Sequence, residues 1–167
     1  MSMRFRVSLI LAFGVFGAGL GGCRTQVADP GPVLVARFLL ESDAQRGALA
    51  VRLPVSGVQV RVAPKPVITE YDIVHVIEAK VDLGPCLLFQ LTPAAARDVY
   101  RLSARNLNRR LLLVLNGEPV GVRVIDRPLE AGMLFIFLEV PNASLPKLVN
   151  DLNRTCLRLQ REAQAKK

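Results

Sequence analysis

The sequence predicts an α+β fold, a mostly antiparallel sheet with helices packed on one face. Three observations support this prediction. β-like apolar runs occupy much of residues 33–64 and 110–140, and two segments, 93–107 and 144–163, repeat apolar residues with a helical period. Asn116-Gly117, the pair favoured in a tight type I′ turn, separates two apolar runs. From residue 86 onward the predicted order of elements is β-α-β-β-β-α.

The first 22 residues have the composition of an export signal. Arg4 and Arg6 precede an uncharged run over residues 7–20, and small residues follow. This run is shorter than the roughly 20 residues that a transmembrane helix needs. The glycines of "GAGLGG" also match the spacing of a dinucleotide-binding loop, but no strand precedes them and no helix follows. We therefore interpret residues 1–22 as a signal peptide.

Leu20-Gly21-Gly22-Cys23 resembles a bacterial lipobox. The resemblance implies a diacylglyceryl group on Cys23, cleavage before it, and a further acyl chain such as palmitate on the new amine. Two or three acyl chains make a durable anchor, whereas one chain binds a bilayer only marginally. An ordinary signal with a chance cysteine, or an uncleaved anchor, is the alternative. We expect a periplasm-facing lipoprotein, and Arg24 after the cysteine favours the outer membrane over the inner.

The composition narrows the classes of partner. Without Arg4 and Arg6, 20 Lys and Arg residues remain against 14 Asp and Glu, a net charge of +6. A basic exported domain attracts anionic lipid headgroups or acidic envelope polymers. Aromatic residues make up only 5% of the chain and no nucleic-acid-binding motif is present, so we expect no nucleic acid partner.

The elements follow in order along the chain. Residues 23–33 are predicted to be a lipidated N-terminus and flexible stalk, because Pro30 and Pro32 interrupt regular pairing. Residues 34–66 form a β-rich part with strands at 33–41, 48–54 and 58–64. Thr69 caps a short turn at 70–73, and strands follow near 76–82 and at 86–91. The main α+β domain is placed at 67–163, with a basic tail at 164–167.

Thr92-Pro93 is a strong helix start, a capping hydroxyl followed by proline at the first helical position. The helix is expected over 93–107, with one side formed by Ala96, Val99, Tyr100, Ser103 and Leu107. A hairpin at 110–125 and a buried strand at 133–140 come next. The last helix, 144–163, has an apolar stripe formed by Leu145, Leu148, Val149, Leu152, Cys156 and Leu159.

Residues 67–140 resemble the periplasmic head subdomain of SecD-type protein-export proteins. The similar segments are the helix start at Leu91-Thr92-Pro93, the stretch "NLNRRLLLVLNG", and the turn at 129–132. The resemblance implies the head fold and a capacity to hold extended polypeptide. Asn116 replaces the family's turn aspartate, and Gly121-Val122-Arg123 replaces its usual "SAP". No later apolar run is long enough to span a membrane, so the resemblance does not imply proton-driven pulling.

Residues with catalytic potential are few. His75 is the only histidine, which excludes histidine triads and multi-histidine metal sites, and we expect it to be structural. Glu70 and Asp72 fit a capped, solvated turn better than a catalytic pair. Cys86 and Cys156 lack the partners of a zinc site. We therefore expect no enzyme, no metal and no cofactor.

Five arginines form the one candidate binding motif. Arg97, Arg101 and Arg105 recur at spacing four on the predicted helix, and Arg109 and Arg110 follow. This spacing gives a single ridge whose like charges oppose the helix by about 0.2–0.5 kcal/mol per pair. One interpretation is a solvated outer face. The other is a docking strip for lipid headgroups, peptidoglycan or an acidic protein surface.

The two remaining cysteines can be bridged or separate. An oxidising periplasm permits a bridge between Cys86 and Cys156. The pattern opposes it: Cys156 lies on the apolar stripe of the last helix, whereas Cys86 shares a strand face with Leu88 and Gln90 rather than with Leu87 and Phe89. We expect two free thiols, with Cys156 buried.

Together these observations predict a membrane-anchored binding or accessory module of the cell envelope. Its partner would be an envelope or export protein, or an anionic polymer. The alternatives are a purely structural envelope lipoprotein and an enzyme with an unrecognised carboxylate site.

Overall fold

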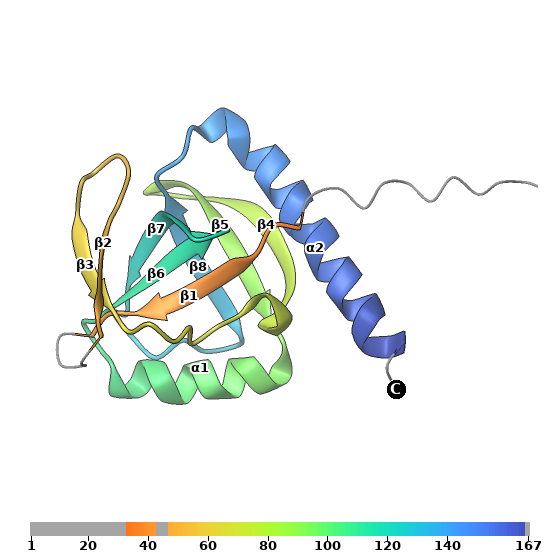
Figure 1. Ribbon diagram of the computed structural model, residues 1–167, viewed down its shortest axis with the longest axis horizontal. Coiled ribbons are helices and arrows are strands. Elements are labelled where there is room, and N and C mark those ends of the chain that lie inside the picture. The colour runs from red at the N-terminus through yellow and green to blue at the C-terminus, as the bar shows by residue number, and fades with distance from the viewer. Residues whose placement is uncertain (1–32, 43–46, 166–167) are drawn as a thin grey trace, which may run out of the picture.

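The computed structural model describes residues 33–42 and 47–165. The predicted signal peptide, the anchor residue Cys23, the stalk up to residue 32 and the last two residues of the tail lie outside the described residues. Within them the α+β prediction is confirmed: a curled antiparallel sheet carries two packed helices (Figure 1).

The main sheet has six strands in the order β1-β6-β7-β8-β5-β4. Their bounds are β1 Ala36–Leu40, β4 Ile73–Val81, β5 Gly84–Leu91, β6 Arg110–Leu115, β7 Glu118–Val124 and β8 Met133–Leu138. β2 (Leu49–Arg52) and β3 (Gln59–Val62) form a separate two-stranded hairpin. Two short 3-10 turns, η1 (Glu70–Asp72) and η2 (Asn142–Ser144), precede β4 and α2. β1 therefore belongs to the same sheet as the strands that follow residue 67.

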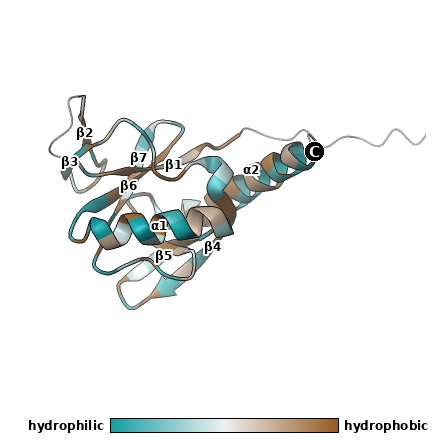
Figure 2. Cartoon of the chain, turned by 90° about the horizontal axis from the view of Figure 1, so that it is seen from below, coloured by the Kyte–Doolittle hydropathy of each residue, from teal (hydrophilic) through white to brown (hydrophobic). Residues whose placement is uncertain are grey.

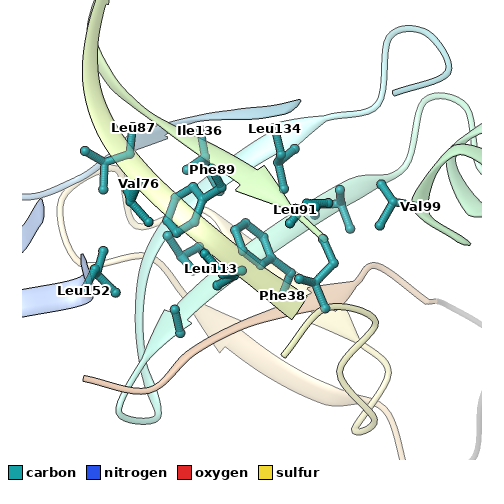
Figure 3. Packing of buried hydrophobic residues seen from close by; sticks show 14 of the residues in the cluster. Phe38, Val76, Leu87, Phe89, Leu91, Val99, Leu113, Leu134, Ile136 and Leu152 are labelled. Atoms are coloured by element: carbon teal, nitrogen blue, oxygen red, sulfur yellow. The ribbon is translucent and has the colours of Figure 1, made fainter. Parts of the chain in front are cut away.

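The concave side of the curled sheet holds the larger core. Phe38 of β1 and Phe89 of β5 meet edge to face, with ring centroids 5.1 Å apart (Figure 3). Aliphatic side chains from β4, β6 and β8 surround this pair, and α2 (Leu145–Ala165) adds Leu145, Leu152 and Cys156. Strands distant in sequence are thus joined through one apolar cluster, which accounts for most of the hydrophobic stabilisation.

The convex side of the sheet is covered only in part. The β2–β3 hairpin lies over β1 and β6 and forms a smaller apolar cluster with them, made of Leu39, Leu53, Val60, Val62, Leu112 and Val114. The β2–β3 hairpin does not extend over the convex sides of β4, β5 and β8. Apolar side chains such as Ile77 and Phe135 are exposed there, although Cys86 on the same side of β5 is buried.

Helix α1 (Pro93–Arg105) begins as predicted. The Thr92 hydroxyl accepts a hydrogen bond from the Ala95 N–H at 3.3 Å, and Pro93 occupies the first helical position. Its buried side differs from the prediction by a rotation about the helix axis. Ala95, Val99 and Ser103 face the core, whereas Tyr100 and Leu107 are 47% and 46% exposed. The predicted stripe thus included two residues that face solvent.

The Asn116-Gly117 turn is confirmed. Both residues have positive φ, 50° and 91°, as a type I′ turn requires. The Asn116 side chain also accepts a hydrogen bond from the Val35 N–H at 2.8 Å, and the Asn116 N–H donates to the Val35 carbonyl at the same distance. The turn therefore joins β6 to β7 and fastens the chain just before β1.

Candidate functional site

The three arginines of α1 lie on its outer side. Arg97, Arg101 and Arg105 are exposed, and α1 lies in front of the strands when the molecule is seen from below (Figure 2). Four residues of helix rise about 6 Å, so the three side chains leave the helix at roughly that interval. Only Arg101 has an acidic neighbour among the described residues, Asp98 at 3.7 Å, and that pair is itself exposed. We refer to Arg97, Arg101 and Arg105 as the arginine ridge.

Arg109 and Arg110 have other contacts. Arg110 forms an ion pair with Glu41 and its Nε donates to the Glu41 carboxylate at 3.0 Å. The Arg109 guanidinium donates to the Glu41 carbonyl at 3.3 Å. These two residues therefore hold β6 against the end of β1, and the exposed basic surface of α1 consists of the first three arginines.

A shallow cleft runs beside the arginine ridge. It has a volume of about 580 Å³ and is lined by Arg97, Tyr100 and Arg101 of α1 and by residues 130–132 of the loop before β8. Gly132 brings this loop close to the helix, because a Cβ atom there would lie 2.8 Å from the Ala96 Cβ. An exposed tyrosine and two arginines therefore line the same cleft.

The two described cysteines are free, as predicted, and both are buried. Cys156 belongs to the main core, whereas Cys86 does not, which agrees with their expected separation. Burial raises the pKa of both thiols, and the positive charge of Arg123 partly opposes this effect at Cys86. Two buried thiols with raised pKa values are poor nucleophiles.

The convex side of β4, β5 and β8 presents an exposed apolar surface. The strand registers place Ile77, Leu88 and Phe135 in one row across the three strands. Ile77 is 43% exposed and Phe135 36%. We call this surface the open face and define it by five apolar side chains: Ile77, Val81, Leu88, Met133 and Phe135. Exposed apolar side chains gathered on one sheet surface are typical of an interaction site.

The outer edge of β4 adjoins the open face. Near its start this edge is covered by α2: the Asn153 side chain bonds both the N–H and the C=O of Val76, at 2.8 and 2.7 Å. Gln160 donates to the Val74 carbonyl at 3.1 Å. In an antiparallel strand alternate residues point their backbone groups outward, so Glu78 and Lys80 continue this series. No described strand or side chain bonds the outward groups of these two residues.

A pocket of about 360 Å³ lies at the far end of the open face. It is lined by Arg123, Arg127, Pro128, Leu129, Glu130, Met133 and Phe135. The last residue pair between β7 and β8 is Val122 with Phe137, so the two strands separate at this point. The Arg123 guanidinium enters the gap and donates to the Phe135 carbonyl at 3.1 Å.

Sequence reasoning missed the open face, the free edge of β4 and the two arginines of this pocket. Alternation in residues 73–91 indicates strands with two faces, but it does not tell which face another element covers. Arg123 and Arg127 lie in and after a strand without regular spacing, so no periodic signal distinguishes them.

His75, the single histidine, is exposed at one end of the convex side of β4. In the described ranges, no three side chains among His, Cys, Asp and Glu are grouped so that they could hold a metal ion. Neither described helix has the length and apolar character needed to cross a membrane.

No family model and no curated protein matches the sequence. The fold is nevertheless similar to solved structures of SecDF. One structure, of SecDF as a membrane component that enhances protein export, aligns with a TM-score of 0.57 and 17% identity, covering 74% of this chain and 64% of that one. SecDF in its super-membrane-facing form gives 0.57 and 18%, covering 74% of this chain and 19% of that one.

A third structure, SecDF from Thermus thermophilus, a translocon-associated membrane protein, gives a TM-score of 0.50 and 17% identity. It covers 77% of this chain and 20% of that one. The chain thus spans less than two thirds of the length of each structure that it matches. At these identities the similarity shows the fold, that of the SecDF periplasmic domains, and the expectation from the head-like motifs is confirmed to that extent.

Proposed function

We propose that this chain is a lipid-anchored binding module of the bacterial cell envelope that holds extended polypeptide and takes no part in catalysis. The proposal rests on one observation: the free edge of β4 lies directly beside an exposed apolar surface. The similarity to SecDF, which enhances protein export, favours an export-related partner.

The edge suits an extended chain of varied sequence. An added strand gains main-chain hydrogen bonds, which do not depend on its sequence, while alternate side chains meet a neighbouring surface. Here the outward backbone groups are those of Glu78 and Lys80, and the adjacent surface is the row from Ile77 to Phe135. The charged side chains of Glu78 and Lys80 disfavour pairing between two copies of the same edge.

The anchor and the arginine ridge belong to the same proposal. Acylation of Cys23 would hold the module at the membrane, facing the periplasm. The arginine ridge would then dock on anionic lipid headgroups, since its guanidinium groups are exposed and only Arg101 has an acidic neighbour among the described residues. The purely structural alternative predicts no binding at either surface.

Lys80→Pro tests the edge. Proline removes the outward N–H of residue 80. It leaves the hydrogen bonds between β4 and β5, because the backbone groups that point toward β5 belong to the residues on either side, Ala79 and Val81. Lys80→Ala is the matched control, since it loses the same charge and keeps the N–H. Binding of a fluorescent, unfolded apolar peptide should weaken at least fivefold in Lys80→Pro and stay near the wild-type value in Lys80→Ala.

Ile77→Lys tests the apolar surface in the same assay. A lysine in the central row should weaken peptide binding, whereas circular dichroism should remain that of a folded sheet because Ile77 is 43% exposed and lies outside both apolar clusters. If both variants bind the peptide as the wild type does, or if the wild type binds no peptide, the proposed function is wrong.

A further inference from the structure

The pocket between β7 and the loop that precedes β8 carries an inference about which polypeptides the open face accepts. The inference rests on the proposed function. Met133 and Phe135 line the pocket and also belong to the open face, so the two surfaces are continuous. Neighbouring strands are about 4.8 Å apart, so Ile77 and Phe135 are separated by roughly 10 Å, or about three residues of extended chain.

Arg123 is fixed in this pocket with part of its hydrogen-bonding capacity unused. Its side chain is 17% exposed, one Nη donates to the Phe135 carbonyl, and the other approaches the Asp126 carboxylate at 3.3 Å. Within the described residues its Nε is buried and has no acceptor. A guanidinium has five N–H donors, so most of those of Arg123 have no acceptor among the described residues.

Arg127, which is exposed, also lines this pocket. Two guanidinium groups at one pocket favour a planar, charged acceptor, which can receive paired hydrogen bonds from either of them. Glu130 also lines the pocket and opposes any anion there. Asp126 is already bonded to Arg123, so the acidic groups nearly balance the two guanidinium groups. The site therefore suits one singly charged carboxylate rather than a highly charged phosphate group.

We propose that the pocket between Arg123 and Arg127 binds a carboxylate of the polypeptide held on the open face. The carboxylate comes from an acidic side chain or from a free C-terminus. A peptide paired with the β4 edge lies one further strand spacing from Phe135, about 14 Å in all, so the chain must leave the edge and cross the open face to reach the pocket. The module then prefers apolar segments that carry an acidic group about four residues beyond the part seated at the β4 edge.

The test uses one apolar peptide in three forms. The first carries a glutamate near its end, the second carries glutamine at that position, and the third carries the glutamine with a free C-terminal carboxylate. The first two have amidated C-termini. For the wild type we expect the glutamate or the free-carboxylate form to bind about five- to tenfold more tightly than the amidated glutamine form, and this preference should shrink as salt is added. The carboxylate form that binds more tightly identifies the source.

Arg127→Gln should abolish the preference, and Glu130→Gln should increase it. Arg161→Gln is the matched control, because it removes the same charge from an exposed site on α2 and should keep the preference. Arg123 is left intact in this test, since its bond to Phe135 supports the gap between the strands.

The two proposals fail in different ways. If all three peptides bind the wild type with equal affinity, the carboxylate site is wrong and the polypeptide-binding function stands. If Arg127→Gln keeps the full preference, the carboxylate is bound elsewhere and the inference is also overturned. If no peptide binds, the proposed function itself has failed.

Discussion

Glu41 and Arg110 join the end of β1 to the start of β6 through both backbone and side chains. The Glu41 carboxylate accepts a hydrogen bond from the Arg110 backbone N–H at 2.9 Å and from its Nε at 3.0 Å. The Glu41 N–H donates to the Arg110 carbonyl at 2.8 Å. The Arg110 side chain holds the pKa of Glu41 below its ordinary value, against the opposing effect of partial burial.

This pair predicts an acid-sensitive contribution to stability. Because the folded-state pKa of Glu41 lies below the ordinary value of 4.5, its stabilisation is complete above that value and is lost as pH falls through the folded-state pKa. Glu41→Gln should lower the free energy of unfolding near neutral pH by about 1.5–3 kcal/mol, the contribution of a charge-assisted hydrogen bond.

Urea denaturation at a series of pH values from neutral to acidic checks this prediction. The difference between wild type and Glu41→Gln should narrow as the pH falls below 4.5. Glu118→Gln, at an exposed position in β7, is the control and should change little. A difference that stays constant across the series would show that the ionised form of Glu41 is not what stabilises the pair.

Asn153→Ala should destabilise the domain by about 1–3 kcal/mol, since it leaves the N–H and C=O of Val76 without their side-chain partner. Asn150→Ala, an exposed position on the same helix, is the matched control. Thermal unfolding measures both variants. Equal melting temperatures would mean that water replaces the Asn153 amide at no cost.

The thiols of Cys86 and Cys156 should react slowly in the native protein, because both side chains are buried and their pKa values are raised. In a Cys23→Ala chain, two thiols should react promptly after denaturation without reductant. Titration with a chromogenic disulfide counts them. A count of zero on a monomeric protein would establish the bridge that the strand pattern disfavours.

Replacing the arginine ridge (Arg97, Arg101 and Arg105) by glutamine should weaken binding to vesicles that contain anionic lipid. The effect follows from the loss of three exposed charges, each worth about 1 kcal/mol near such a surface. Vesicle sedimentation of the non-acylated chain measures it. The control replaces Arg52, Arg61 and Arg161, which are also exposed. An equal loss in both variants would reveal a dependence on net charge alone, and binding only to peptidoglycan or to an acidic protein would redirect the proposal.

Cys23→Ala should abolish incorporation of labelled palmitate and release the protein from the membrane fraction. The reason is the lipobox-like order Leu20-Gly21-Gly22-Cys23, which predicts the sulfur of Cys23 as the acylation site. Fractionation and labelling of cells that express each form provide the measurement. Label retained by the variant would exclude Cys23 as the attachment point.

The sequence predicted best where local chemistry decides the structure. Thr92-Pro93 and Asn116-Gly117 carry their signals within a few residues, and both the helix start and the turn are confirmed. The alternation in residues 58–62 likewise gives a strand with Val60 and Val62 buried. In each case the dihedral preference or the capping group acts over a distance shorter than one element.

Relations between distant elements could not be derived in this way. The helical period of α1 was correct, but its rotation depends on how the 130–132 loop and the sheet pack against it, so Tyr100 was misassigned. The same limit applies to the open face: Ile77 and Phe135 alternate like core residues, and only the position of the β2–β3 hairpin over the other strands leaves them exposed.

The curled sheet has a seam between β4 and α2 that is closed by side-chain amides instead of strand pairing. Asn153 and Gln160 occupy the outward groups of Val74 and Val76, and the series continues unoccupied, among the described residues, at Glu78 and Lys80. Such a seam opens at lower free energy than a ladder of paired strands. The position of helix α2 therefore sets the length of β4 edge that is open to an added strand. Each side-chain amide of α2 that breaks its hydrogen bonds would expose the backbone groups of one more outward-facing residue of β4 to an incoming chain.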